Sequence, residues 1–253
     1  MKLRCASYVT AFCLVSSNGA AAGLAVAPME QHVQGQQAAT YVASNMDEKA
    51  IAVEVLVEEW TINEAGEEIR KPSADLVAYP RQFILKGSSA KNIKVGRRDR
   101  NAAIDKEKCY RVTIRELPIS LEPEEPGTYH IYRASAYRTS YYVQPRRPDV
   151  QLEYVDSQLD GSSLVLRLVN AGNTHIHLQN PVLTLSYADG SKTEIRDKEL
   201  LKPLAGENMH AQITRRFGID VKGFQKKGTR ITGGTLSFED NGILEAQPVR
   251  FSL

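Results

Sequence analysis

The sequence lacks long apolar runs, and no stretch approaches the roughly 20 residues that a membrane-spanning helix needs. It is also poor in cysteine. Cys5 and Cys13 lie among the first 22 residues, so only Cys109 remains beyond them, which excludes an intrachain disulfide there. Because Cys109 begins a segment with a period of two, we expect a buried small side chain rather than a reactive thiol.

The chain has little net charge outside its N-terminus. Of 32 Lys and Arg residues, Lys2 and Arg4 lie within residues 1–22, where there is no acidic residue. The rest of the chain therefore carries 30 basic residues against 30 acidic ones. This balance gives no reason to expect nucleic-acid binding.

Sequence patterns of catalysis are missing as well. There is no G-x-S-x-G and no H-E-x-x-H motif, and no Cys–His pairing is indicated. The segment Gly223–Thr229 resembles a phosphate-binding loop only superficially, because no Lys follows its second Gly and no helix is predicted after it. We expect a basic turn there, and neither enzymatic activity nor a cofactor.

One pair of side chains has metal-ligand chemistry. His175 and His177 are two residues apart, and on a strand this spacing places both imidazoles on one face. The sequence places no third ligand beside them, and a polar outer strand face explains the pair better. We therefore expect no metal site, and a bound metal ion is the minority alternative.

The N-terminal segment has the order of a secretory signal. The positive residues Lys2 and Arg4 precede a short, mostly apolar stretch from 5 to 15, and Ala20–Ala22 offers small residues for cleavage before Gly23. We predict that residues 1–22 are a signal peptide and that the mature protein is periplasmic, without membrane insertion.

The remaining residues predict an all-β protein, because short alternating runs recur between turn signals and no amphipathic helix of three turns occurs. Pro145–Pro148 is a stiff break, so we expect one β-sandwich domain over residues 23–145 and a second over 146–253. In the first, Ile51, Val53, Val55 and Val57 should share one buried face. The predicted strands are Ala38–Ala43, Ile51–Trp60, Asn92–Gly96, Cys109–Leu117, Tyr129–Val143, Gln151–Val155, Leu164–Val169, Val182–Tyr187, Ile213–Phe217, Thr235–Phe238 and Val249–Leu253.

The run from Tyr129 to Pro145 is the most informative segment. It has no Gly or Pro before Pro145, and a Pro/Glu-rich loop separates it from the shorter strand that starts at Cys109. A long strand beside a shorter one leaves an edge that can pair with another chain.

A series of segments within residues 24–145 has a distinctive order and spacing. They are Leu24–Pro28, Gln34–Gly35, Val55–Trp60, Leu76–Pro80, Arg81–Leu85, Ile93–Val95, Tyr110–Pro118 and the long final strand that ends at Pro145. In these segments the chain resembles the periplasmic chaperones of the chaperone–usher pilus pathway, and their archaic, spore-coat-type branch more than the type 1 or P-pilus branch. For residues 149–253 the resemblance is to architecture alone.

The resemblance implies two immunoglobulin-like domains set at an angle and a function without catalysis. The chaperones of this pathway lend the last strand of their first domain to a pilus subunit that lacks one, and an outer-membrane usher then receives the subunit. With Pro145 aligned to the proline that closes the family's donor strand, one strand face is predicted to bind the subunit. That face consists of Tyr129, Ile131, Arg133, Ser135, Tyr137 and Thr139.

Two further positions depart from the pattern of the family. Many members hold the subunit's terminal carboxylate with basic residues, but Met29 or Glu30 and Ser140 stand at those positions. Arg138 is a candidate substitute, with an ordinary solvated residue as the equal alternative. Glu107 corresponds to an acidic inter-domain residue, although Gln144 replaces its usual Arg partner.

The sequence therefore predicts a periplasmic chaperone of pilus subunits that acts by donor-strand complementation, and the free protein has an edge that a second copy could cap. The alternative is a secreted immunoglobulin-like binding or adaptor module that keeps its edge strand. A weaker third option is an accessory protein that binds a fibre without delivering subunits.

Overall fold

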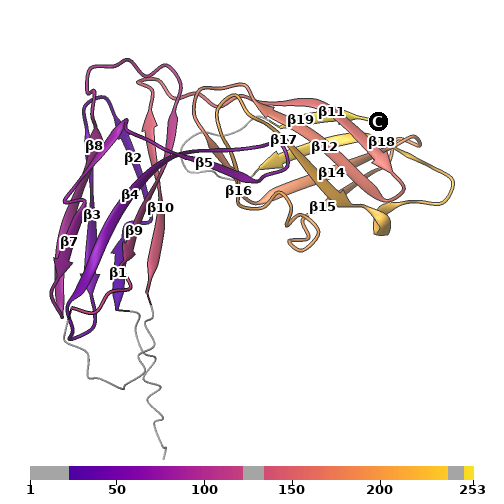
Figure 1. The fold of residues 1–253 in the computed structure, drawn as a ribbon. Helices are drawn as coiled ribbons and strands as arrows, with labels where there is room; N and C mark the ends of the chain where they lie inside the picture. The colour runs from indigo at the N-terminus through magenta and orange to yellow at the C-terminus, as the bar shows by residue number, and fades with distance from the viewer. Residues whose placement is uncertain (1–22, 122–133, 239–247) are drawn as a thin grey trace, which may run out of the picture.

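The computed structural model describes residues 23–121, 134–238 and 248–253. Two β-sandwiches follow each other along the chain and meet at a bend, so that the molecule has the outline of an L (Figure 1). The predicted all-β fold with two β-sandwich domains is confirmed. None of the helices in the described residues could cross a membrane.

Two sheets form the first sandwich. Their strand orders are β1-β3-β8-β6 and β2-β10-β9-β4-β5, and β7 pairs with β4 as well. All neighbours are antiparallel except β2 and β10, which run parallel. The strands are β1 (Leu24–Ala27), β2 (Glu30–Gln34), β3 (Ala38–Asn45), β4 (Ile51–Ile62), β5 (Glu68–Pro72), β6 (Leu76–Tyr79), β7 (Gln82–Leu85), β8 (Ser89–Arg97), β9 (Lys108–Glu116) and β10 (Ala136–Gln144).

The second sandwich has a three-stranded sheet β11-β12-β17, a four-stranded sheet β15-β14-β18-β19, and the short pair β13-β16. A single 3-10 turn, Lys222–Phe224, follows β17. The strands are β11 (Leu152–Asp160), β12 (Ser163–Asn170), β13 (Ile176–Leu178), β14 (Pro181–Tyr187), β15 (Lys192–Ile195), β16 (Glu207–Met209), β17 (Thr214–Asp220), β18 (Ile231–Phe238) and β19 (Val249–Ser252).

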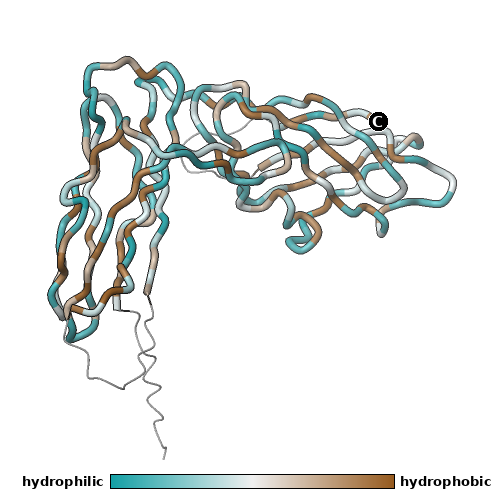
Figure 2. Tube along the Cα trace, in the orientation of Figure 1, coloured by the Kyte–Doolittle hydropathy of each residue, from teal (hydrophilic) through white to brown (hydrophobic). Residues whose placement is uncertain are grey.

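Each sandwich has its own apolar core, to which many strands contribute alternate residues. Val53 and Val55 of β4 are each 1% exposed, and Val57 packs against the same core, as predicted. In β12 the alternating residues Leu164 and Leu166 are fully buried. Figure 2 shows apolar segments along the strands of both sandwiches and polar segments mainly at their loops.

Within the described residues, the strand that was predicted over Tyr129–Val143 begins later in the chain than expected. Strand β10 begins at Ala136, and Ser135 lies outside it. The reason is the length of its partner, because β9 ends at Glu116, two residues before Pro118. Residues 129–133 of the predicted strand lie outside the described residues.

A hairpin of the first domain reaches the second domain. The turn Asn63–Gly66 joins β4 to β5, with Gly66 at φ +92° donating its N–H to the Asn63 carbonyl over 3.0 Å. From this turn the Glu64 carbonyl accepts the Arg216 N–H at 2.9 Å, and the Glu64 carboxylate pairs with Arg167. The hairpin thus ties β4 and β5 to β12 and β17, the arrangement visible in Figure 1.

Candidate functional site

The outer edge of β10 is covered over only part of its length. On one side β10 pairs with β9 over Ala136–Val143, whereas on the other side β2 covers only Ser140–Gln144. Within the described part of the chain, the stretch Ala136–Thr139 therefore has a strand partner on one side alone. An edge of this kind is a template for strand addition.

The backbone groups on this open edge belong to the even-numbered residues. The Ser140 N–H points outward to the Met29 carbonyl at 2.9 Å, while the Ser135 carbonyl points to β9 and accepts the Glu116 N–H at 2.9 Å. Because backbone groups alternate in direction along a strand, Ala136 and Arg138 direct their N–H and carbonyl groups to the uncovered side. They are the groups that an added strand would pair with.

The odd-numbered residues of β10 face the core of their own domain. Thr139 is fully buried and donates its hydroxyl hydrogen to the Val112 carbonyl at 3.0 Å, and Tyr137 packs half-buried against the same core. Ser135 is half-buried just before the strand. The other members of the predicted subunit-binding face, Tyr129, Ile131 and Arg133, lie outside the described residues.

Arg138 lies on the opposite face of the sheet, where it is exposed and forms no ion pair with any residue that the structure describes. A second guanidinium, which the sequence did not single out, lies nearby. Arg111 Nη1 donates to Ser140 Oγ at 2.6 Å, while its Nε and Nη2 donate to the Glu68 carboxylate at 2.9 and 3.3 Å. Arg111 is therefore already neutralised within the first domain.

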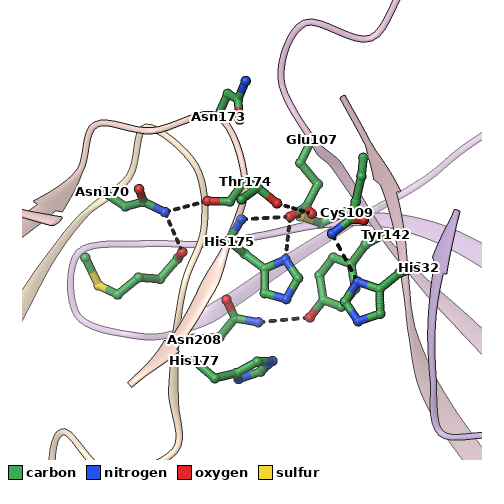
Figure 3. A network of polar contacts seen from close by, with 12 residues as sticks. His32, Glu107, Cys109, Tyr142, Asn170, Asn173, Thr174, His175, His177 and Asn208 are labelled. Carbon is green, nitrogen blue, oxygen red and sulfur yellow. Dashed lines mark hydrogen bonds and ion pairs between the residues drawn. The ribbon is translucent and has the colours of Figure 1, made fainter. Parts of the chain in front are cut away.

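Glu107 lies at the junction of the two domains, and its side chain is fully buried (Figure 3). Its carboxylate accepts the Thr174 hydroxyl at 2.7 Å, the His175 backbone N–H at 3.1 Å and His175 Nδ1 at 2.6 Å. Burial opposes the ionised form, but the hydrogen bond and charge of His175, together with the other bonds, outweigh it and lower the pKa of Glu107. Glu107 thus joins the start of β9 to the loop before β13.

The ring of His175 is held by stacking and by a hydrogen bond at its edge. It stacks on Tyr142 of β10 with centroids 3.8 Å apart, and His32 of β2 lies 5.4 Å away in a near-parallel orientation. The Tyr142 hydroxyl accepts Asn208 Nδ2 at 2.9 Å (Figure 3). Strands from both domains therefore fix the position of this imidazole.

Glu30 and His177, whose side chains can also act as metal ligands, lie beside this stack. Glu30 Oε1 is 2.8 Å from His32 Nε2, and its Oε2 is 3.6 Å from His177 Nε2. These neighbours, His177 first, hold the pKa of Glu30 well below its usual range. The sequence placed no third ligand-type side chain beside His175 and His177, but the two domains meet here and bring in Glu30 from β2. The prediction that His175 lies on a polar outer strand face is wrong, because His175 is only 9% exposed.

Cys109 lies on the other side of Glu107. The thiol is 7% exposed and lies 3.7 Å from Glu107 Oε1. Burial first, and then the neighbouring carboxylate, raise the pKa of this thiol. The predicted buried, unreactive cysteine agrees with this setting. With Trp60, Ile62 and Tyr142, Cys109 forms a small apolar cluster at the junction.

We expect His210 to make the junction sensitive to acid. Its ring packs edge-on against Trp60 with centroids 4.3 Å apart. Burial lowers the pKa of His210 to about 3 from the usual 6.5. The charges of His175, Arg111 and His177 also lower this pKa, whereas the charge of Glu107 raises it. The unfolded chain then binds a proton that the native protein does not. The contribution of His210 to the free energy of unfolding is thus fully present above about pH 6.5, and it is lost as the pH drops toward 3.

The test compares urea unfolding at pH 7.5 and pH 4.5, followed by the fluorescence of Trp60, the single tryptophan. The loss of unfolding free energy between the two pH values should be smaller in His210→Phe by about 2 kcal/mol. This variant keeps an aromatic ring against Trp60 but does not titrate. Equal losses in both proteins would contradict the prediction.

Comparison with known proteins is consistent with this architecture. Residues 32–141 match the family model described as "Pili and flagellar-assembly chaperone, PapD N-terminal domain", which confirms the resemblance predicted from the sequence. No curated protein matches the chain significantly.

Several solved structures share the two-domain fold. A class 5 fimbriae chaperone, CfaA, is 12% identical with a TM-score of 0.61, and the match covers 90% of this chain and 98% of CfaA. A chaperone–tip adhesin complex of CFA/I fimbriae gives the same score and identity, with coverage of 91% and 98%. The CsuC–CsuE chaperone–tip adhesin complex of archaic Csu pili from Acinetobacter baumannii is 15% identical, with a TM-score of 0.53 and coverage of 90% and 98%. At these identities the likeness establishes the fold.

Proposed function

Because residues 32–141 match the model of the PapD N-terminal domain of pili and flagellar-assembly chaperones, we propose that this protein is a periplasmic chaperone that binds pilus or fimbrial subunits by donor-strand complementation. A subunit with an incomplete sheet receives a strand of the chaperone, which satisfies its backbone groups and covers its core. The chaperone then delivers the subunit to an outer-membrane usher. This function requires binding and no catalysis.

The open edge at Ala136–Thr139 is the observation that supports this proposal most directly. Strand β2 stops covering β10 at Ser140, so that the even-numbered backbone groups before it are available to a partner. Two of the structurally similar proteins are described as complexes with tip adhesins, which makes a subunit of that kind a reasonable occupant. Main-chain pairing supplies affinity in such complexes, and alternate side chains supply specificity.

The predicted subunit-binding face is kept with one refinement. Thr139 is fully buried in its own domain, so we propose that it orients β10 rather than entering the subunit. Tyr137 is half-buried at the margin of the same core, and the side chains that enter the subunit's groove then belong to Tyr129, Ile131, Arg133, Ser135 and Tyr137.

Arg138 remains our proposed anchor for a carboxylate of the subunit. Its guanidinium is exposed beside the open edge, and a guanidinium binds a carboxylate through two parallel hydrogen bonds. Arg111 is a poorer candidate because Glu68 already occupies two of its nitrogens.

Co-expression with the small secreted proteins encoded beside its gene tests the proposed function. The chaperone carries a C-terminal affinity tag and is recovered from the periplasm. We expect a soluble one-to-one complex with a protein that aggregates when it is expressed alone. A monomer with every candidate would contradict the proposal and favour the secreted binding module. A self-dimer with every candidate would contradict delivery too, and would assign the open edge to a second copy.

A further inference from the structure

Three side chains from both domains converge in the angle between the sandwiches. Glu30 begins β2, His175 precedes β13 and His177 lies within it, and their ligand-type atoms all lie within 4.8 Å of one another. They border a hollow of about 150 Å³ that Gln144, Pro148 and Val150 also line. No part of the proposed strand donation uses this cluster.

The atoms that face one another have free lone pairs for a cation. His175 Nδ1 donates to Glu107, so its Nε2 carries the lone pair. His32 Nε2 contacts Glu30 Oε1, which leaves Oε2 directed to His177 Nε2 at 3.6 Å. The set thus presents two imidazole nitrogens and one carboxylate oxygen.

The groups around His175 hold its ring as the neighbours of a metal-binding histidine do. Metal-binding histidines commonly donate their second ring N–H to a carboxylate, which fixes the tautomer and makes the ring a better ligand. Glu107 does this for His175, and Tyr142 holds the ring by stacking (Figure 3). A histidine on a solvated strand face has no such support.

The distances suit a small tetrahedral ion. Bonds of about 2.0–2.1 Å at tetrahedral angles place neighbouring ligand atoms roughly 3.4 Å apart. The Glu30–His177 separation of 3.6 Å is already close to this value. The other separations are at most 4.8 Å, so a closure of no more than about 1.4 Å is needed, which small side-chain rotations can supply. Calcium and magnesium are disfavoured, because they take mostly oxygen ligands.

We propose that Glu30, His175 and His177 form a binding site for a borderline divalent cation, zinc in the first instance, between the two domains. Two His and one Glu are a ligand set that zinc uses with a fourth position open. The bound ion would link β2 of the first domain to β13 of the second and so fix the angle between the sandwiches. Because β2 pairs with β10 at Ser140, the ion would also hold the strand that borders the open edge.

Zinc titration of the purified full chain tests this site. The protein carries no polyhistidine tag and is first dialysed against a chelator. We expect one zinc ion per chain by isothermal titration calorimetry. In Glu30→Gln and His177→Gln the affinity should fall about tenfold or more, while Glu194→Gln, which changes an exposed carboxylate on β15, should bind as the unsubstituted protein does.

A spectroscopic and a thermal readout complement the calorimetry. Cobalt should give the intense visible absorption of a tetrahedral complex in the unsubstituted protein and in Glu194→Gln, but not in Glu30→Gln. Zinc at about 100 times its dissociation constant should raise the Tm by about 5–10 °C, and only when the three ligands are present. No binding near 100 μM zinc, or equal affinity in all variants, would overturn the proposal.

Discussion

Arg138→Pro is expected to abolish co-purification of the subunit, with a loss of about tenfold or more, while the chaperone stays folded. The backbone N–H of Arg138 points to the uncovered side of β10, as deduced from the opposite directions of Ser140 N–H and the Ser135 carbonyl. A proline there removes a donor that an added strand needs and places its ring against that strand. Proline is tolerated on an edge strand where the N–H would face outward.

Two control variants separate the contributions of backbone and side chain. Arg138→Ala keeps the N–H and removes the guanidinium, so it should lose only the part of the affinity that a carboxylate anchor contributes. Thr139→Pro removes an N–H on the β9 side and should unfold the first domain, because Thr139 lies inside the ladder. If Arg138→Pro retained the subunit at the normal yield, strand addition at this edge would be wrong.

Glu107→Ala is expected to lower the free energy of unfolding by about 3–5 kcal/mol. The carboxylate accepts hydrogen bonds from the Thr174 hydroxyl and from two groups of His175, and its removal leaves three donors without that acceptor in a buried junction. Urea unfolding followed by circular dichroism and by Trp60 fluorescence measures the loss. Because Trp60 belongs to the junction cluster, its signal should change at lower urea than in the unsubstituted protein.

Matched substitutions show whether the loss comes from the network or from removing any acidic residue. Glu107→Gln keeps an acceptor oxygen and the side-chain volume, so we expect about 1–2 kcal/mol. Glu194→Ala removes an exposed carboxylate paired with Arg196 and should cost no more than about 0.5 kcal/mol. A loss below 1 kcal/mol in Glu107→Ala would show that the junction is held elsewhere, for instance by the Asn63–Gly66 turn.

The strands that carry the two cores could be located in the sequence because they are long and alternate strictly. Val53 and Val55, like Leu164 and Leu166, follow the period of two that a half-buried strand imposes, and all four are buried. The short strands β13 and β16 were not identified, since three residues show no period. They form because the second sandwich supplies partners for them, a condition that local sequence does not reveal.

The candidate site could be predicted only in part, for the same reason. The alternation in β10 separates the odd from the even residues, but the register with β2 determines which backbone groups stay uncovered. The sequence drew attention to Arg138, whereas Arg111 and Ser140 come together only because β9 and β10 are paired. Cross-strand neighbours follow from the register of a sheet, and no local pattern specifies them.

By itself the sequence determined the all-β class and the buried faces of the long strands, because periodicity acts locally. Only the tertiary structure decided what surrounds His175. Glu107 lies 68 residues before it and belongs to the other domain, and Glu30 comes from a third segment. A buried carboxylate and a cluster of ligand-type side chains can form there because docking of the two sandwiches removes water from groups that would otherwise be solvated separately.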